Sequence, residues 1–293
     1  MDDTNDKHAM NMRLYNNRTT FNRSAEREPT TRTLPTLSVV GAGLGDPELI
    51  TLKALKALQQ ADVVLYDALA NEDLLQHCPA HAIRQYVGKR KGAHSMSQDD
   101  INALIVHYAQ THQHIVRLKG GDPLVFGRGF EEMMYAAQHG MNVEYIPGVS
   151  SAFAAAGLAN IPLTYRGTSD SLWVLTGSTV NGIHSQELYR AAQSKTNATV
   201  VVLMGLEALP TIAEVFAVYG KSELPVAVIS NSSLPDEHVV VGTVETIAEQ
   251  VQNANVRSPA VIVLGAVVGL REQMQELQRE YAASEQFLFK PLT

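Results

Sequence analysis

The stretch that decides the fold is VVGAGLGDPELITLKALKAL, residues 39–58. A short apolar run meets Gly41, Gly43 and Gly45, and apolar residues then recur three and four positions apart. This order predicts a buried strand, a tight turn and an amphipathic helix. The helix is expected to begin near Pro47, because the first amides of a helix lack intrahelical partners and proline is tolerated there.

The glycine turn resembles part of a dinucleotide-binding fingerprint, and Asp67 closes the next apolar run, as an acidic residue does in that motif. The spacing differs, however, because the chain has G-A-G-L-G where the fingerprint has G-x-G-x-x-G. Asp46 and Pro47 also place a carboxylate and a missing amide where a pyrophosphate needs donors. The turn alone therefore leaves open a dinucleotide site, a turn without a ligand, and a site for another ligand.

The segments that follow continue to alternate between strand and helix patterns up to about residue 160. Ser97, with Asp100 three residues later, is the expected cap of one of these helices. Alternation of this kind predicts a mostly parallel sheet. The expected strands lie around 62–67, 114–119 and 142–146, and the expected helices around 97–111, 129–140 and 150–159.

From about Ser169 the pattern changes to a block that is richer in strands, with clear helices only at about 207–219 and 243–252. We therefore expect an α/β protein of two α/β domains with the active site in the inter-domain cleft, a common place for small-molecule sites. The predicted divisions are a disordered extension over 1–35, domains over 36–168 and 169–271, and a helix and tail over 272–293.

The composition of the 293 residues excludes several classes of protein. The net charge of −7 argues against a general nucleic-acid binder. Cys78 is the only cysteine, which excludes a disulfide framework and a structural zinc site and fits a reducing cytoplasm. Apolar runs stay shorter than the roughly 18 residues of a membrane helix. The polar N-terminus lacks the apolar core of a signal peptide, and its early aspartates argue against a transit peptide.

A second glycine loop, RLKGGDPLVFGRGFEE over 117–132, is more informative. Gly120 and Gly121 allow close backbone approach, and Asp122 adds a carboxylate beside them. A ligand with a cationic group and ribose hydroxyls, such as S-adenosylmethionine, suits this loop better than a phosphate does. Arg128 and Glu131 stand at helical i, i+3 spacing, which is also the spacing of an ordinary exposed ion pair.

A basic run, YVGKRKGAHSMSQ over 86–98, stands out in an acidic chain. A charge run of this kind is usually a solvated loop. The alternative is a binding site for a polyanion, to which Arg128 and Arg166 would add. The basic residues are Lys89, Arg90, Lys91 and His94.

Taken in order, these segments resemble the tetrapyrrole methylase family over about Leu37 to Arg271. The quoted motifs are joined by PGVSSAFAAAGLANIPLTYRG, VVVLMGL and SPAVIVLGAVV. The VGKR…HS and GRGFEE segments are most similar to the branch that methylates uroporphyrinogen III at two adjacent rings to give precorrin-2. The resemblance implies S-adenosylmethionine in the cleft between two α/β domains, no metal, no nucleic-acid or membrane partner, and a homodimer.

The resemblance also implies roles for individual residues. Asp67 matches the proton acceptor, Lys89 the proton donor, and Arg128 is placed with them as catalytic. Arg128, Glu131 and Arg166 match residues that engage the tetrapyrrole, which carries eight carboxylates and so needs fixed cations. The implied cofactor-binding residues are Leu44, Gly120, Gly121, Asp122, Val125, Ser150, Ser151, Met204 and Ser232.

Several residues depart from the family pattern. Leu44 stands in place of a proline, Ala68 in place of an arginine, Phe130 in place of a glycine and Tyr165 in place of a histidine, and SNSSL replaces a glycine-containing turn. The bulk of Phe130 beside Arg128 predicts either a narrower tetrapyrrole cleft or an adjusted loop. These departures leave two alternatives: a related methylase that acts on a later corrin intermediate, and a degenerate member kept as a binding subunit.

Overall fold

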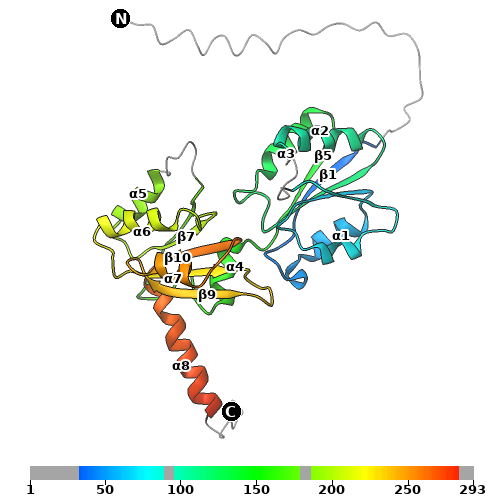
Figure 1. Ribbon diagram of the computed structural model, residues 1–293. Coiled ribbons are helices and arrows are strands. Elements are labelled where there is room, and N and C mark those ends of the chain that lie inside the picture. Colours follow the sequence, from blue (N-terminus) through cyan, green and yellow to red (C-terminus); the bar gives the residue numbers. More distant parts are fainter. Residues whose placement is uncertain (1–32, 89–95, 179–185, 284–293) are drawn as a thin grey trace, which may run out of the picture. The chain divides into compact units, whose positions relative to one another are not determined.

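Two β-sheets organise the described residues, 33–88, 96–178 and 186–283 of this computed structural model (Figure 1). The described residues from Leu34 onward belong to one compact unit. Almost all of the predicted N-terminal extension lies outside the described residues, as does the end of the predicted C-terminal tail.

In the described residues the first sheet has five strands in the order β3-β2-β4-β1-β5, and every pairing is parallel. The parallel sheet predicted from the strand–helix alternation is therefore confirmed. β1 is an interior strand between β4 and β5, with Val40 opposite Leu118 of β4 and Ile146 of β5. The strands are β1 (Thr36–Gly41), β2 (Val63–Tyr66), β3 (Ile83–Tyr86), β4 (His114–Lys119) and β5 (Asn142–Ile146).

Helices cover both faces of this sheet, because successive strand residues point to opposite sides. Val40, Val64 and Leu118 pack with α1 and η3 on one face, while Leu65 and Ile115 pack with α2 and α3 on the other. Figure 1 shows α1 and the α2–α3 pair on opposite sides of β1. The helices are α1 (Leu52–Gln59), η3 (Glu72–His77), α2 (Gln98–Ala109) and α3 (Gly129–Gln138).

The start of the first helix differs from the prediction. Pro47 begins a short 3₁₀ turn, η2 (Pro47–Leu49), and α1 begins only at Leu52, after the Thr51 hydroxyl accepts from the Ala54 amide at 3.2 Å. Thr51 is the N-cap of α1, a role that Pro47 cannot fill, because a proline side chain has no acceptor for an unpaired amide at the helix start. The cap predicted for α2 is confirmed, with reciprocal bonds between Ser97 and Asp100.

The second sheet has the order β6-β7-β10-β8-β9 within the described ranges, with β6 and β7 parallel and the other pairings antiparallel. Its strands are β6 (Leu172–Thr176), β7 (Thr199–Leu203), β8 (Pro225–Ser230), β9 (His238–Thr243) and β10 (Ala260–Leu264). The two helices expected here are present as α6 (Leu209–Val218) and α7 (Ile247–Asn253), and a further one, α5 (Gln186–Gln193), was not predicted.

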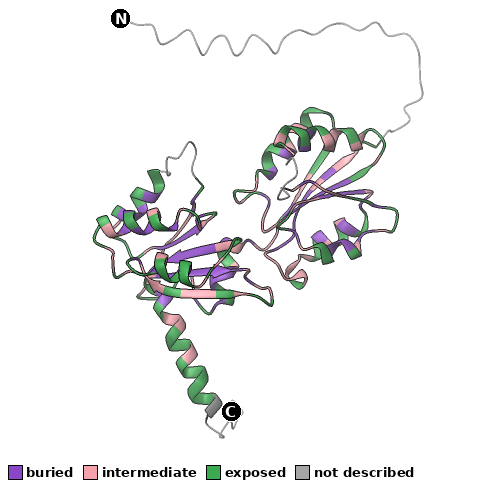
Figure 2. Cartoon of the chain, viewed as in Figure 1, coloured by how far each residue is buried: buried purple, intermediate pink, exposed green. Residues whose placement is uncertain are grey.

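The alanine-rich helix α4 (Ser151–Leu158) packs against this second sheet. Its Ala152, Ala155 and Ala156 join a buried cluster with β7, β8, β10 and η4 (Ala266–Gly269), while α5, α6 and α7 pack on the opposite face. Figure 2 shows buried residues along several strands of this sheet. The elements up to β5 therefore pack in the first sheet and α4 already packs against the second, whereas the predicted division at residue 168 lies after α4. The domain division itself stays a prediction.

The last described helix, α8 (Leu270–Ala283), carries a mainly exposed surface. Arg271 at its start donates a hydrogen bond to the Ala159 carbonyl. Over the described ranges, every helix is too short or too polar to cross a membrane.

Candidate active site

The loops that follow β1, β4 and β5 meet through glycines. A Cβ on Gly41 would lie 2.4 Å from the Gly148 Cα, and one on Gly148 would lie 2.2 Å from the Gly121 carbonyl oxygen. The Gly121 amide donates to the Gly43 carbonyl at 2.6 Å, and the Gly43 amide to the Gly121 carbonyl at 3.4 Å. The glycines of the two loops thus hold each other, and these amides do not form a phosphate cradle.

A cavity of about 830 Å³ lies beside these loops. Its lining residues come from both halves of the compact unit: the loops after β1, β2 and β4, the start of α4, and the ends of β7 and β8. All nine residues that the family resemblance assigns to the cofactor line this one cavity: Leu44, Gly120, Gly121, Asp122, Val125, Ser150, Ser151, Met204 and Ser232.

The charge of the lining distinguishes between ligands. Asp122 is the only ionisable side chain among the lining residues that the structure describes. The phosphates of a dinucleotide would find no cation there, whereas a ligand with positive charge would meet a carboxylate. Across the described ranges, no three His, Cys, Asp or Glu side chains gather to hold a metal ion.

Asp122 is itself held by protein donors. Its Oδ2 accepts from the Tyr145 hydroxyl at 2.6 Å and the Gly148 amide at 3.3 Å, and its Oδ1 from the Leu124 amide at 2.8 Å. Burial, and then the hydrogen bond and negative charge of Asp122, raise the pKa of Tyr145 to about 12. Asp122 therefore fixes the shape of the loop as well as lining the cavity.

This pair predicts a loss of stability at alkaline pH. A phenol in an unfolded chain has a pKa of about 10, whereas the folded protein holds the Tyr145 proton up to about pH 12. The stabilisation is complete below about pH 10 and is lost as the pH rises through the folded value. Urea unfolding of Tyr145→Phe should show a free energy of unfolding that declines less steeply over this pH window than that of the wild type.

Tyr189→Phe, at an exposed tyrosine of α5, is the control, and its free energy of unfolding should decline as that of the wild type does. Identical curves for all three proteins would contradict the prediction.

Several lining residues have a strained backbone. Phe126, Met204 and Asn231 have φ angles of 53°, 54° and 49°, a left-handed conformation that costs residues with side chains of the order of 1 kcal/mol each. Such residues cluster where the surrounding structure fixes a functional geometry. Met204 is also 55% exposed, which is unusual for a methionine at a strand end and leaves its thioether free for a ligand.

The first glycine loop is clamped to the other half of the cavity wall. The Asp46 amide donates to the Ser233 hydroxyl at 2.9 Å, and Leu44 packs against the apolar cluster of the second sheet. The Asn71 amide group donates to the Gly45 carbonyl at 2.8 Å. Leu44, in place of the family's proline, thus adds an apolar contact to a loop that hydrogen bonds already hold.

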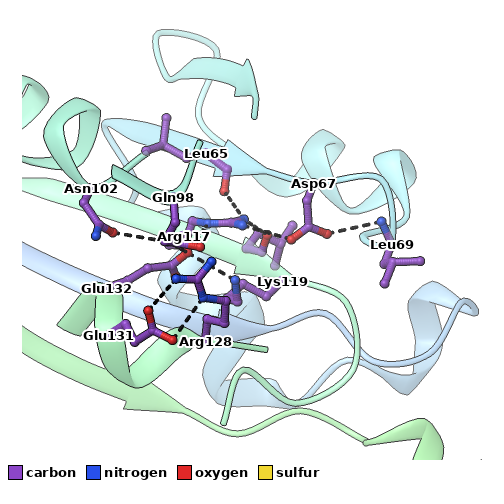
Figure 3. A network of polar contacts seen from close by, with 11 residues as sticks. Leu65, Asp67, Leu69, Gln98, Asn102, Arg117, Lys119, Arg128, Glu131 and Glu132 are labelled. Carbon is purple, nitrogen blue, oxygen red and sulfur yellow. Dashed lines mark hydrogen bonds and ion pairs between the residues drawn. The ribbon is translucent and has the colours of Figure 1, made fainter. Parts of the chain in front are cut away.

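Asp67 follows β2 and precedes Ala68, Leu69, Ala70 and Asn71, which line the cavity, although Asp67 itself does not. Its Oδ1 accepts from the Leu69 amide at 3.2 Å and its Oδ2 from Arg117 Nη2 at 3.0 Å (Figure 3). The side chain is 23% exposed. The carboxylate is therefore fixed at both oxygens while it remains accessible to solvent.

The residues predicted to engage the tetrapyrrole lie outside the cavity lining. Arg128 pairs with Glu131 at 2.6 Å, and both side chains are more than half exposed (Figure 3). Arg166 and Tyr165 are also exposed. Phe130 is 60% exposed at the start of α3 and does not line this cavity, so the expected narrowing is not seen there. Lys89 and the rest of the basic run up to residue 95 lie outside the described residues.

Sequence reasoning missed the buried charges behind Asp67. Arg117 and Lys119 on β4 and Glu132 on α3 are all nearly inaccessible, and burial, then the adjacent Arg117 cation, lower the pKa of Lys119. The available signal was the alternation in HIVRLK: two cations two residues apart in a buried strand point to the same face. Charged residues are rarely buried without a partner.

Comparisons with known proteins identify the family of the chain. Residues 36–248 match the family described as Tetrapyrrole (Corrin/Porphyrin) Methylases. The chain is 44% identical to the uroporphyrinogen-III C-methyltransferase of Methanocaldococcus jannaschii, over 79% of this chain and 96% of that protein. It is 43% identical to the siroheme synthase of Acinetobacter baylyi, over 82% of this chain but only 52% of that protein.

Among solved structures, uroporphyrin-III C-methyl transferase from Thermus thermophilus, complexed with S-adenyl homocysteine, superposes with a TM-score of 0.69 and 39% identity. The match covers 80% of this chain and 99% of that one. The chain spans about half the length of the siroheme synthases that it matches. By sequence and by fold, the chain belongs to the tetrapyrrole methylase family.

Proposed function

We propose that this protein is a methyltransferase that uses S-adenosylmethionine to methylate uroporphyrinogen III on ring carbons of two adjacent rings, giving precorrin-2. One observation carries the proposal: the nine residues assigned to the cofactor converge on a single cavity, and Asp67 stands next to its wall. The extended similarity to C-methyltransferases of this substrate supports the choice of tetrapyrrole.

The cavity suits S-adenosylmethionine in shape and charge. A Cβ on Gly121, whose φ is 65°, would meet only the Ser150 Cα, at 4.0 Å, so a side chain there would occupy open space that a ligand can fill. Ile229 and Val261 supply apolar wall, and Asp122 supplies negative charge. When bound, S-adenosylmethionine supplies a methyl group on an activated sulfonium sulfur, so the protein mainly has to align the reacting atoms.

Asp67 is the proposed proton acceptor. Formation of the new carbon–carbon bond leaves the ring system cationic until it loses a proton. A positioned carboxylate that accepts this proton contributes typically about 10²–10⁴-fold to the rate. Lys89, which lies outside the described residues, remains the proposed proton donor.

The substrate carboxylates are proposed to bind Arg128 and Arg166. The hydrogen bond from Arg128 lowers the pKa of Glu131. The Glu131 carboxylate is therefore charged, and it competes with a substrate carboxylate for the Arg128 guanidinium. A substrate carboxylate must therefore replace Glu131 or share Arg128 with it. An exposed pair of this kind contributes little to stability, so a polycarboxylate ligand can displace it.

The direct test is to incubate the protein with S-adenosylmethionine and enzymatically made uroporphyrinogen III under anaerobic conditions. Mass spectrometry should detect a bismethylated product. Calorimetric binding of S-adenosylmethionine without methylation of this substrate would instead favour a related methylase with a later corrin substrate, or a non-catalytic member. Absence of both binding and turnover would overturn the proposal.

Met204→Ala should weaken S-adenosylmethionine binding about tenfold, because covering a methionine side chain contributes of the order of 1.5 kcal/mol. Isothermal titration calorimetry measures the change. Met274→Ala is the matched control, since Met274 is similarly exposed, at 46% against 55%, but lies on α8 and does not line the cavity. Equal affinities for the two variants would remove Met204 from the proposed cofactor site.

We further propose that the protein works as a homodimer in the cytoplasm. The family resemblance supports the dimer, and α8 offers exposed apolar side chains at three- and four-residue spacing, namely Met274, Leu277 and Tyr281. The single cysteine, Cys78, is buried and suits a reducing compartment. Sedimentation velocity and cell fractionation test the two statements.

A further inference from the structure

Arg117 lies in the middle of the first sheet, where a charge is costly. Its side chain is only 4% exposed on β4, on the face that α2 and α3 cover. Taking a cation out of water costs several kcal/mol unless partners compensate for it. The contacts of Arg117 therefore show why the charge is kept.

The guanidinium of Arg117 joins two carboxylates (Figure 3). Nη2 donates to Asp67 Oδ2 at 3.0 Å, and Nε donates to Glu132 Oε1 at 3.2 Å. Nη1 donates to the backbone carbonyls of Leu118 at 2.8 Å and Leu65 at 3.4 Å. Every nitrogen of the planar group is engaged, which fixes its orientation.

Glu132 holds the Arg117 guanidinium through the hydrogen bond from Nε to Oε1. It is fully buried on α3, and its Oε1 also accepts from Lys119 Nζ at 3.2 Å and Gln98 Nε2 at 3.1 Å. Within the described residues, its Oε2 has no hydrogen-bond partner. Two cations and two carboxylates balance one another, which offsets part of the cost of burying them.

Solvent exposure increases along this chain of side chains, from Glu132 through Arg117 to Asp67. Glu132 is inaccessible, Arg117 nearly so, and Asp67 is 23% exposed beside the cavity wall. Arg117 and the Leu69 amide each occupy one oxygen of Asp67, so the remaining acceptor directions of the carboxylate are set by the fold.

We propose that Arg117, held by Glu132, is a positioning residue that orients the Asp67 carboxylate toward the substrate. The inference rests on the proposed function, in which Asp67 accepts the proton. A lysine at position 117 keeps the charge but cannot reach both carboxylates in the same plane, because it has no guanidinium fork. Displacement of a reacting group by about 1 Å can cost roughly 100-fold in rate.

The test compares Arg117→Lys with the wild type in single-turnover methylation of uroporphyrinogen III. The rate of the chemical step should fall about 10- to 100-fold, while KM for the tetrapyrrole and Kd for S-adenosylmethionine stay within about twofold. In an Asp67→Asn background, the same change should have no further effect on the rate, because the two residues then act as a unit. Arg84→Lys, at an exposed arginine on the edge strand β3 of the same sheet, is the control and should leave the rate unchanged.

Glu132→Gln serves if Arg117→Lys does not fold, since it keeps the shape and the acceptor oxygen. It should lower the rate about 3- to 10-fold, again without effect in the Asp67→Asn background. Rates equal to the wild type, or losses that add to that of Asp67→Asn, would overturn the positioning role while leaving the function intact. A wild-type protein that does not methylate uroporphyrinogen III would instead remove the proposed function, and the inference with it.

Discussion

Asp67→Asn should lower the rate of uroporphyrinogen III methylation by about 10²–10⁴-fold, the usual contribution of a positioned general base. The amide keeps the size of the carboxylate, and its oxygen can still accept from Arg117 or the Leu69 amide. It cannot accept the proton that the methylated ring must lose. The expected loss therefore falls on the chemical step, which single-turnover kinetics measures.

Binding of the methyl donor is the control for this variant. Asp67 does not line the cavity, so Kd for S-adenosylmethionine should stay within about twofold of the wild type. Loss of the single negative charge also leaves Arg117 with Glu132 as its carboxylate partner, so the fold should persist. A variant with wild-type turnover would show that another group accepts the proton.

Gly148→Ala should destabilise the protein by about 3 kcal/mol, at the upper end of the range for forcing an added methyl group into packed structure. The new Cβ would lie 2.2 Å from the Gly121 carbonyl oxygen and 2.7 Å from the Gly41 Cα. Both are backbone atoms, so no side chain can rotate away. Relief requires the loop after β5 to move away from the loops after β1 and β4, which also disturbs the wall of the cavity.

Gly157→Ala provides the matched control in the neighbouring helix. Gly157 is exposed in α4, and a Cβ there would meet no heavy atom within 4 Å. That change should stabilise the protein by about 0.5–1 kcal/mol, because alanine loses less backbone entropy than glycine. Urea unfolding distinguishes the two signs. Equal stabilities would mean that the glycine contact relaxes without cost.

Local sequence patterns were sufficient to predict most of the strands and most of the helices, although the edge strand β3 was not predicted. Periodicity located β1, β4 and β5, and the Ser97–Asp100 pair located the start of α2, because these signals act within a few residues. The helix α5 was missed because its eight residues are mainly polar and carry only a short apolar face, with Leu188, Ala191 and Ala192 buried. Its burial depends on α6 and β6, which sequence proximity does not reveal.

In the candidate site too, local sequence patterns predicted what is adjacent in the chain and missed the long-range contacts. The glycine loops were recognisable because Gly120, Gly121 and Asp122 are adjacent in the chain. The contact of Asp67 with Arg117 joins residues 50 positions apart, and that of Asp46 with Ser233 joins residues 187 positions apart. Local pattern carries no information on such pairs. It also could not show that the Asp122 carboxylate accepts hydrogen bonds from Tyr145, Gly148 and Leu124.

The interior place of β1 in the first sheet, between β4 and β5, has a consequence for synthesis of the chain on the ribosome. β1 is the first of the described strands to emerge, but its two neighbours are β4, which ends at Lys119, and β5, which begins at Asn142. A nascent chain that stops before residue 142 leaves one edge of this apolar strand without hydrogen-bond partners. Unpaired strand edges readily join other chains. Chaperone protection is therefore needed most during the interval between the emergence of β1 and the emergence of β5.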